Sequence, residues 1–202
     1  MKRKEGSVIL TNDLYGLILM GGKSSRMGTD KSELNYHGKP HVEFMYELAS
    51  SLVSKAFVSV KDESAKPNFT DLFISDSYEL GGPINGILSA MTQFPDKAWL
   101  VLAVDMPFVN ELTIRQLLES RNKEKIATAF ATRESGLPEP LAAIWEPGSR
   151  ELLRQHYLVE DKKCPRGFLM EKDIELVYPK NDLELYNANN PDEYEHAKSL
   201  IK

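Results

Sequence analysis

An apolar run at residues 14–20 stops abruptly at two adjacent glycines, Gly21 and Gly22. The run is almost continuous in leucine and isoleucine rather than alternating, which predicts a strand buried on both faces of a parallel sheet. Glycines directly after such a strand let the backbone turn tightly and expose its N–H groups to a ligand. Arg26 and Lys31 add positive charge to the same loop. The segment therefore predicts a cradle for the phosphates of a nucleotide.

The spacing within this loop excludes two common phosphate-binding motifs. A P-loop places its lysine directly after the last glycine, whereas two residues separate Gly28 from Lys31. The dinucleotide-binding fingerprint Gly-x-Gly-x-x-Gly is also absent, because Gly21 and Gly22 are adjacent. The alternative interpretation is a glycine-rich turn from strand to helix whose charged side chains are simply solvated.

Along the rest of the chain, short apolar segments alternate with segments of helical periodicity. Such alternation predicts a single α/β domain with a Rossmann-like, mixed but mostly parallel sheet and helices on both faces. We expect this domain to span residues 14–202, behind a flexible extension at residues 1–13. Strands are expected at residues 14–20, 56–60, 72–74, 98–104, 126–131, 141–145 and 174–178, and helices behind Pro40, near residues 84–91, 112–118 and 151–157, and after the cap residue Asn190.

Composition narrows the class of protein. A chain of 202 residues with 42% hydrophobic and 27% charged residues can bury one ordinary globular core. The single cysteine, Cys164, excludes an internal disulfide framework, and no apolar run is long enough to span a bilayer. The formal net charge of −5 argues against non-specific binding to nucleic acid. We therefore expect a cytoplasmic protein without a membrane or nucleic-acid partner.

Local basic groups still allow an anionic small ligand. One basic cluster comprises Lys23, Arg26, Lys31 and Lys39, and a second comprises Lys162, Lys163 and Arg166. For either cluster the alternative is a solvated face. Of the four histidines, none has the spacing of a metal ligand or a catalytic triad.

Three further segments have residues suited to a site. Asp105 directly follows the strand expected at residues 98–104, and a carboxylate at that edge of the sheet can hold Mg²⁺ against phosphate oxygens. Its alternative role is a cap for the following helix or turn. Asp76 precedes a Gly82-Pro83 turn into a helix, and Asn187 and Asn189 share one face of an extended segment.

Together these segments resemble, in order and spacing, the MobA-like family of nucleotidyltransferases. The loop at residues 17–31 matches Leu-x-Gly-Gly-x-x-x-Arg-Met-Gly-x-x-Lys, and Asp105 opens the family's Asp-x-Pro-Phe. The segment at residues 82–87 departs from Gly-Pro-Leu-x-Gly-Ile only by Ile84, and Asn187 begins a segment similar to Asn-x-Asn-x-Pro-Glu-Glu. The resemblance covers about Tyr15 to Leu200 and is weakest between Val159 and Asp173.

The resemblance implies a fold of the nucleotide-diphospho-sugar transferase type and a role for each matching residue. Asp105 would bind Mg²⁺, and Lys31 and Arg26 would act with it in catalysis by offsetting phosphate charge. The residues expected to bind the nucleotide are Leu19, Met20, Gly21, Gly22, Lys31, Asp76, Gly82, Pro83 and Asp105. The residues expected on the side of the pterin substrate are Asn187, Asn189 and Pro140.

The implied reaction is transfer of GMP from GTP to the terminal phosphate of molybdopterin, in its molybdenum-bearing form, with release of pyrophosphate. Other proteins of molybdenum cofactor biosynthesis are possible partners. A cytidylyltransferase or a sugar-phosphate nucleotidylyltransferase of the same fold remains an alternative, as does a non-catalytic nucleotide-binding module. Gly22 favours GTP, because relatives that prefer cytosine usually carry alanine there and a glycine leaves room for a purine.

Overall fold

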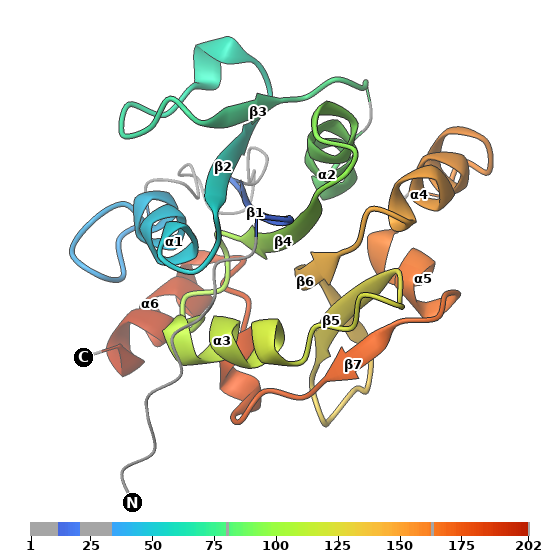
Figure 1. The fold of residues 1–202 in the computed structure, drawn as a ribbon. Helices are drawn as coiled ribbons and strands as arrows, with labels where there is room; N and C mark the ends of the chain where they lie inside the picture. Colours follow the sequence, from blue (N-terminus) through green and yellow to red (C-terminus); the bar gives the residue numbers. More distant parts are fainter. Residues whose placement is uncertain (1–11, 21–33, 80, 163, 202) are drawn as a thin grey trace, which may run out of the picture.

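The computed structural model describes residues 12–20, 34–79, 81–162 and 164–201. Within them one sheet of seven strands runs in the order β3-β2-β1-β4-β6-β5-β7 (Figure 1). The strands are β1 (Leu14–Leu19), β2 (Lys55–Val60), β3 (Phe73–Ser75), β4 (Ala98–Ala103), β5 (Ala127–Ala131), β6 (Pro138–Trp145) and β7 (Glu175–Val177). The helices are α1 (His41–Ser50), α2 (Pro83–Gln93), α3 (Glu111–Glu119), α4 (Ser149–Leu158), α5 (Pro165–Met170) and α6 (Pro191–Leu200), with 3₁₀ turns η2 (Glu63–Ala65) and η3 (Asp182–Leu185).

Most neighbouring strands are parallel, which confirms the expected mixed sheet. β1 pairs in parallel with β2 and β4, β2 with β3, and β5 with β7. Only β6 runs against its neighbours, β4 and β5. The carboxyl ends of the other strands and the amino end of β6 therefore meet at one edge of the sheet, the position where ligands bind in open α/β folds.

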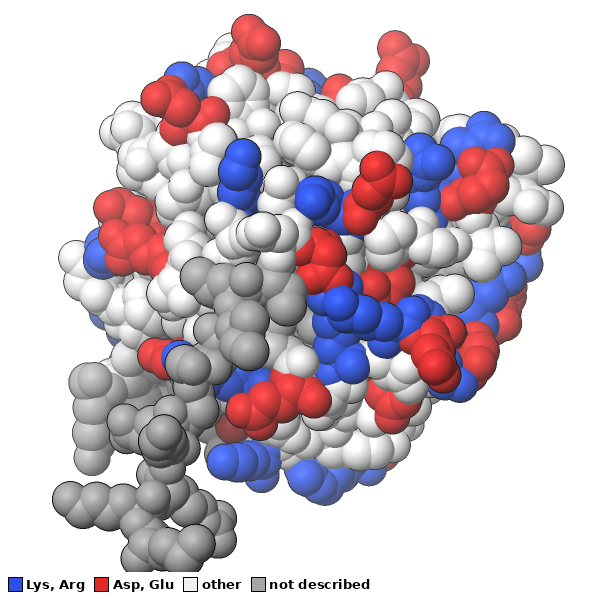
Figure 2. All heavy atoms as spheres, in the orientation of Figure 1, with Lys and Arg blue, Asp and Glu red and all other residues white. Residues whose placement is uncertain are grey.

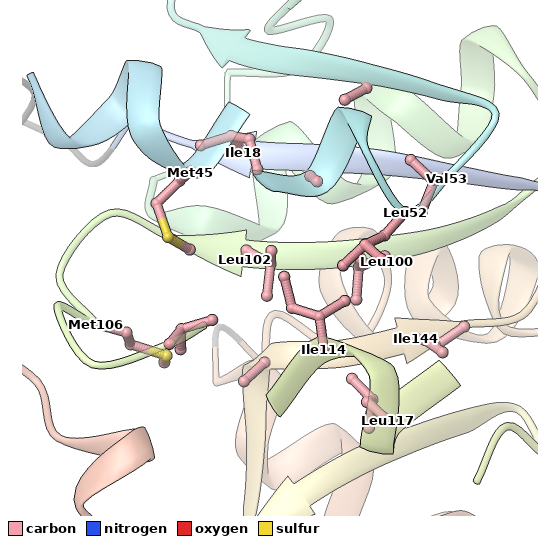
Figure 3. Close-up of a cluster of buried hydrophobic side chains, with 14 of the residues drawn as sticks. Ile18, Met45, Leu52, Val53, Leu100, Leu102, Met106, Ile114, Leu117 and Ile144 are labelled. Atoms are coloured by element: carbon pink, nitrogen blue, oxygen red, sulfur yellow. The ribbon is translucent and has the colours of Figure 1, made fainter. Parts of the chain in front are cut away.

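Helices cover both faces, as the sequence predicts. On one face α1 and α3 pack on Ile18, Leu100 and Leu102 of β1 and β4 (Figure 3). On the other face α2, α4 and α5 pack on alternate residues of the same strands, such as Leu17 and Trp99. Both faces of β1 and β4 are thus buried, which is why these strands are apolar throughout.

The expected elements are confirmed, with boundaries that differ by a few residues. Pro40 is the N-cap of α1, and Asn190 caps α6 by accepting a hydrogen bond from the Glu193 N–H. The structure adds α5, whose six residues are too few to show a helical period. Its N-cap is the exposed Cys164, whose sulfur accepts from the Gly167 N–H at 3.4 Å. None of the helices in the described parts of the chain is long and apolar enough to cross a membrane.

Candidate functional site

The ends of β1 and β4 bring two of the sequence motifs together. The N–H of Val104, which follows β4, donates to the carbonyl oxygen of Leu19, the last residue of β1, at 3.3 Å. Asp105 is therefore adjacent to the point where β1 leads into the glycine-rich loop. Leu19 is buried, and Met20 packs against the apolar cluster beneath the edge. The expected site residues Gly21, Gly22, Arg26 and Lys31 lie outside the described residues.

Asp105 is partly exposed, with one carboxylate oxygen, Oδ1, screened from solvent. Of the two alternative roles for Asp105, a cap on the following helix is wrong, whereas a cap on the turn before Pro107 stays a prediction. Asn110 caps α3, because its Oδ1 accepts hydrogen bonds from the N–H groups of Leu112 and Thr113. The Asp105 carboxylate is thus not used to start the helix.

The asparagine segment reaches Asp105 from the far end of the chain. The Ala188 N–H donates to the carbonyl oxygen of Asp105 at 2.8 Å, which places Asn187 and Asn189 on either side of that contact. The Asn187 amide donates back to the Leu185 carbonyl at 3.2 Å, so its nitrogen supports the local turn. Asn189 is exposed, and its backbone N–H is held by the Glu193 carboxylate at 2.6 Å. The structure therefore brings this motif to the same edge as Asp105.

Asp76 lies further along the edge, just past β3. Its N–H donates to the Val60 carbonyl at 3.0 Å, which ties the ends of β2 and β3 together. Burial raises the pKa of the Asp76 carboxyl, while the charge of Lys61 lowers it. Strand order separates Asp76 from Asp105 by β2 and β1. A ligand that contacts both carboxylates must lie across the ends of these strands, as an extended nucleotide would.

The loop after Asp76 is held against α2 by hydrogen bonds. Ser77 N–H donates to the Ser89 hydroxyl at 2.8 Å, and the Asn85 amide donates to the Tyr78 carbonyl at 2.6 Å. Gly82 is the N-cap of α2 with φ of +80°, a conformation that favours glycine, and Pro83 occupies the first turn. The Gly82-Pro83 turn is thus explained by the start of a helix, whose exposed end faces the edge of the sheet.

Gly86, one turn into α2, has a packing role that the sequence did not reveal. A Cβ atom at this position would lie 2.8 Å from Leu19 Cδ2 and would also overlap the Ser59 hydroxyl. The glycine therefore lets α2 approach the ends of β1 and β2 closely.

Pro140, expected on the pterin side, is buried within β6, and its carbonyl accepts from the Trp145 indole at 3.0 Å. The neighbouring Glu139 was not among the expected site residues, although it lies in the segment at residues 136–143, which resembles a family segment that faces the second substrate. It is 9% exposed and forms an ion pair with Arg166 of α5 at 2.7 Å. Within that segment, the local signal was an acidic residue between two prolines at the start of an apolar strand.

Two histidines, which sequence spacing left without a role, lie beneath the Asp105 loop. His37 Nε2 is 3.2 Å from the Pro107 carbonyl, and its ring lies 5.6 Å from that of the fully buried His41. Burial, and after it the charge of His37, lower the pKa of His41 to about 4, although the nearby Met106 carbonyl acts to raise it. Both rings support the loop as part of its packing.

The family model and the curated relatives that match this chain agree on one family. Residues 16–174 match the family model described as a MobA-like NTP transferase domain. A molybdenum cofactor biosynthesis bifunctional protein of Synechocystis is 32% identical over 90% of this chain, but the chain spans only about half (52%) of that protein's length. A probable molybdenum cofactor guanylyltransferase of Natranaerobius thermophilus is 27% identical over 95% of this chain and 98% of its own length.

Among solved structures, the molybdopterin-guanine dinucleotide biosynthesis protein A of Archaeoglobus fulgidus superimposes with a TM-score of 0.77. The match covers 92% of this chain and 97% of that one at 24% sequence identity. At this level of identity the match establishes the shared fold.

Proposed function

The chain belongs to the family of MobA-like NTP transferase domains, and we propose that it transfers GMP from GTP to the terminal phosphate of molybdenum-bearing molybdopterin. In this reaction a phosphate oxygen of the acceptor forms a bond to the α-phosphorus of GTP. The bond between that phosphorus and the bridging oxygen to the β-phosphate breaks, and pyrophosphate leaves with the electron pair. The relatives named guanylyltransferase support the choice of nucleotide.

One observation carries this proposal: three motifs from distant parts of the chain meet at the Asp105 loop. Leu19, where the glycine-rich loop begins, accepts from Val104, and Ala188 of the asparagine segment donates to Asp105 itself. A nucleotide and a second substrate that meet at this loop would be held close enough to react. Holding two substrates in this way supplies a large share of the catalysis of group transfer.

The chemistry of Asp105 fits a magnesium ion. No group of three or more His, Cys, Asp or Glu side chains gathers within the described residues, so those residues form no closed cage for a metal. Mg²⁺ usually takes one or two protein carboxylates and completes its shell with phosphate oxygens and water. Asp105, with one oxygen screened from solvent at the edge, suits such an open site. The bound ion would act as a Lewis acid toward the phosphates.

The protein's own groups would bind and orient the substrates. Lys31 and Arg26 would offset negative charge on the α-phosphate and the leaving group. The amides of Gly21 and Gly22 would hold the nucleotide beside Leu19 and Met20, with Asp76 and the Gly82-Pro83 turn on its sugar or base side. A general base is not required, because a phosphate monoester, with a second pKa near 6, is already anionic at neutral pH.

The test is pyrophosphate release from GTP with purified protein, Mg²⁺ and molybdopterin carrying molybdenum. We expect release that depends on both substrates, and a higher kcat/KM for GTP than for CTP. Because a methyl group at Gly22 would occupy space used by a purine, Gly22→Ala should narrow this preference by about 10- to 100-fold. Equal or better use of CTP would make the enzyme a cytidylyltransferase, and release only with a sugar phosphate would indicate the sugar-nucleotide alternative. Nucleotide binding without any release would indicate a binding module.

A further inference from the structure

Glu139 is a buried acid that the roles above do not use. Its Oε1 accepts from the Leu141 N–H at 3.2 Å, and its Oε2 accepts from Arg166 Nη2 at 2.7 Å. Arg166 Nε donates to the Pro138 carbonyl at 3.0 Å. The guanidinium is therefore attached to the start of β6 at two points, and these contacts leave its Nη1 group unused.

An irregularity in β6 places this pair beside Asp105. Ala129 of β5 pairs with Ala143, but the next residue, Phe130, pairs with Glu139, so β6 bulges between these two pairings. Bulges of this kind redirect a side chain and are frequent next to active sites. Because β6 is antiparallel to β4, its first residues lie beside the loop that follows β4. The charge of Asp105 is accordingly among those that raise the pKa of Glu139, after the larger effect of burial.

In the Glu139–Arg166 pair only the acid is buried, whereas in the other buried ion pair among the described residues both partners are buried. At the opposite edge, the side chains of Arg121 and Glu146 are 8% and 6% exposed, so acid and base are enclosed together. In the Glu139 pair the acid side chain is 12% exposed while the Arg166 side chain is 46% exposed. Burying an ion pair seldom gives net stability over apolar residues of similar size. A buried acid under a half-exposed guanidinium is an arrangement that holds a cation in one orientation at the surface.

Strand order indicates which substrate this cation faces. Apart from Asp105, which follows β4, the expected nucleotide residues lie at or after the ends of β1 and β3, on one side of β4. Glu139 and Arg166 belong to β6 and α5, on the other side. An anion beside Arg166 is then separated from the nucleotide residues by the Asp105 loop. Figure 2 shows basic and acidic side chains interspersed on one face of the molecule, so a fixed local cation counts for more than overall charge.

We propose that Arg166 binds the phosphate of the acceptor substrate and that Glu139 is the positioning residue that holds the guanidinium for it; this inference rests on the proposed function. The planar guanidinium can give the unused Nη1 hydrogens to a phosphate monoester while Nε and Nη2 stay attached to Pro138 and Glu139. Glu139 acts through Arg166 and does not itself touch the substrate.

The experiment measures molybdopterin binding without nucleotide, and then KM for each substrate, in four proteins. Arg166→Gln should weaken molybdopterin binding about 10- to 100-fold, the range typical of a lost hydrogen bond to a charged group. Glu139→Gln keeps the shape and the contact with Leu141, and should raise the KM for molybdopterin about 3- to 10-fold while leaving the KM for GTP unchanged. The matched control is Arg154→Gln, which breaks an exposed ion pair with Glu151 on α4 and should change neither constant.

A double variant distinguishes a role of the Glu139–Arg166 pair in stability from its role in binding molybdopterin. Glu139→Gln combined with Arg166→Met replaces the pair by residues of similar size, so the melting temperature should stay within a few degrees while molybdopterin binding is lost. A folded Arg166→Gln protein with unchanged molybdopterin affinity would overturn the inference, as would a rise in the KM for GTP instead of the acceptor. If the wild type binds molybdopterin but transfers no nucleotide, the proposed function fails, while the binding measurements still decide the role of Arg166.

Discussion

At the scale of single residues, the carboxylate of Asp105 is not the cap of the helix that follows it. Asn110 caps the following helix, and the backbone of Asp105, rather than its carboxylate, holds Ala188. The carboxylate lies just past the end of β4, at the edge of the sheet where the motifs meet.

We expect Asp105→Asn to leave the fold intact and to lower turnover about 10²- to 10³-fold. The amide keeps the shape of the side chain and removes the charge that would hold Mg²⁺, and loss of one such contact typically has this cost. Steady-state kinetics at saturating Mg²⁺, with a thermal melt of each protein, measure both effects. The control is Asp96→Asn in an exposed turn, which should behave as the wild type. Normal turnover of a folded Asp105→Asn protein would remove this residue from the mechanism.

Protonation of His41, which packs beneath the Asp105 loop, makes the stability of the protein depend on pH. Because burial holds its pKa at about 4 in the folded protein, against about 6.5 when unfolded, the unfolded state binds more protons between these values. Its contribution to stability is complete above pH 6.5 and is lost as the pH falls toward 4. From pH 7 to pH 5 the free energy of unfolding should fall by about 2 kcal/mol on account of this residue.

Urea unfolding of the wild type and of His41→Phe at pH 7 and pH 5 tests this expectation. The variant keeps an aromatic ring against Tyr36 and has no group to protonate, so its stability should fall less between the two pH values. His37, whose pKa is also lowered by burial, remains in both proteins and cancels in the comparison. Equal losses in the two proteins would show that His41 does not cause the pH dependence.

At the scale of elements, the packing of α2 on the sheet depends on Gly86. The helix approaches β1 and β2 so closely that any side chain here would meet Ser59 and Leu19. Since α2 also holds the Asp76 loop through Ser89 and Asn85, its position determines where that loop lies.

Gly86→Ala should therefore destabilise the protein although alanine favours helices. Overpacking typically costs about 1–3 kcal/mol, against a gain of about 1 kcal/mol in helix propensity. We expect a net loss of about 1 kcal/mol, or a melting temperature lower by about 2–4 °C in a protein of this size. Gly148→Ala is the matched control, because a Cβ atom there meets open space and its φ is −62°. A Gly86→Ala melt no lower than that of the control would contradict the close approach.

At the scale of the whole molecule, one sheet with an apolar layer on each face positions the described residues of the site. Residues that follow β1, β3 and β4 and those before β6 and α6 all lie at one edge, so a ligand that spans them binds only the folded chain. Such a ligand stabilises the entire domain.

We expect Mg²⁺ with GTP, at about 100 times its dissociation constant, to stabilise the protein by about 2.7 kcal/mol. This corresponds to a melting temperature higher by roughly 5–10 °C, measured by calorimetry. CTP at the same concentration should give a smaller shift, and chelation of Mg²⁺ should reduce the shift with GTP. Equal shifts with GTP and CTP would argue against the purine preference, and no shift with either would argue against a nucleotide site.

Local sequence patterns were sufficient to predict most of the helices and strands and the mixed sheet. The unbroken apolar runs of β1 and β4 identify strands covered on both faces. Pro40 marks a helix start through its fixed backbone, and Asn190 marks one through its side-chain cap. The short helix α5 was missed because six residues give too little periodicity to recognise. The order of the motifs along the chain also sufficed to identify the family, because each motif is a contiguous segment.

Only the tertiary structure decided which distant residues meet and what each one does there. Ala188 and Asp105 are joined by a backbone hydrogen bond across the chain, and Glu139 holds Arg166 from another element. Gly86 proved to serve close packing, and Asn110 rather than Asp105 proved to cap α3. Strands and caps depend on neighbouring residues, which the sequence lists in order. Contacts between elements depend on the direction of β6, the bulge within it and the depth of each side chain, and no local pattern specifies these.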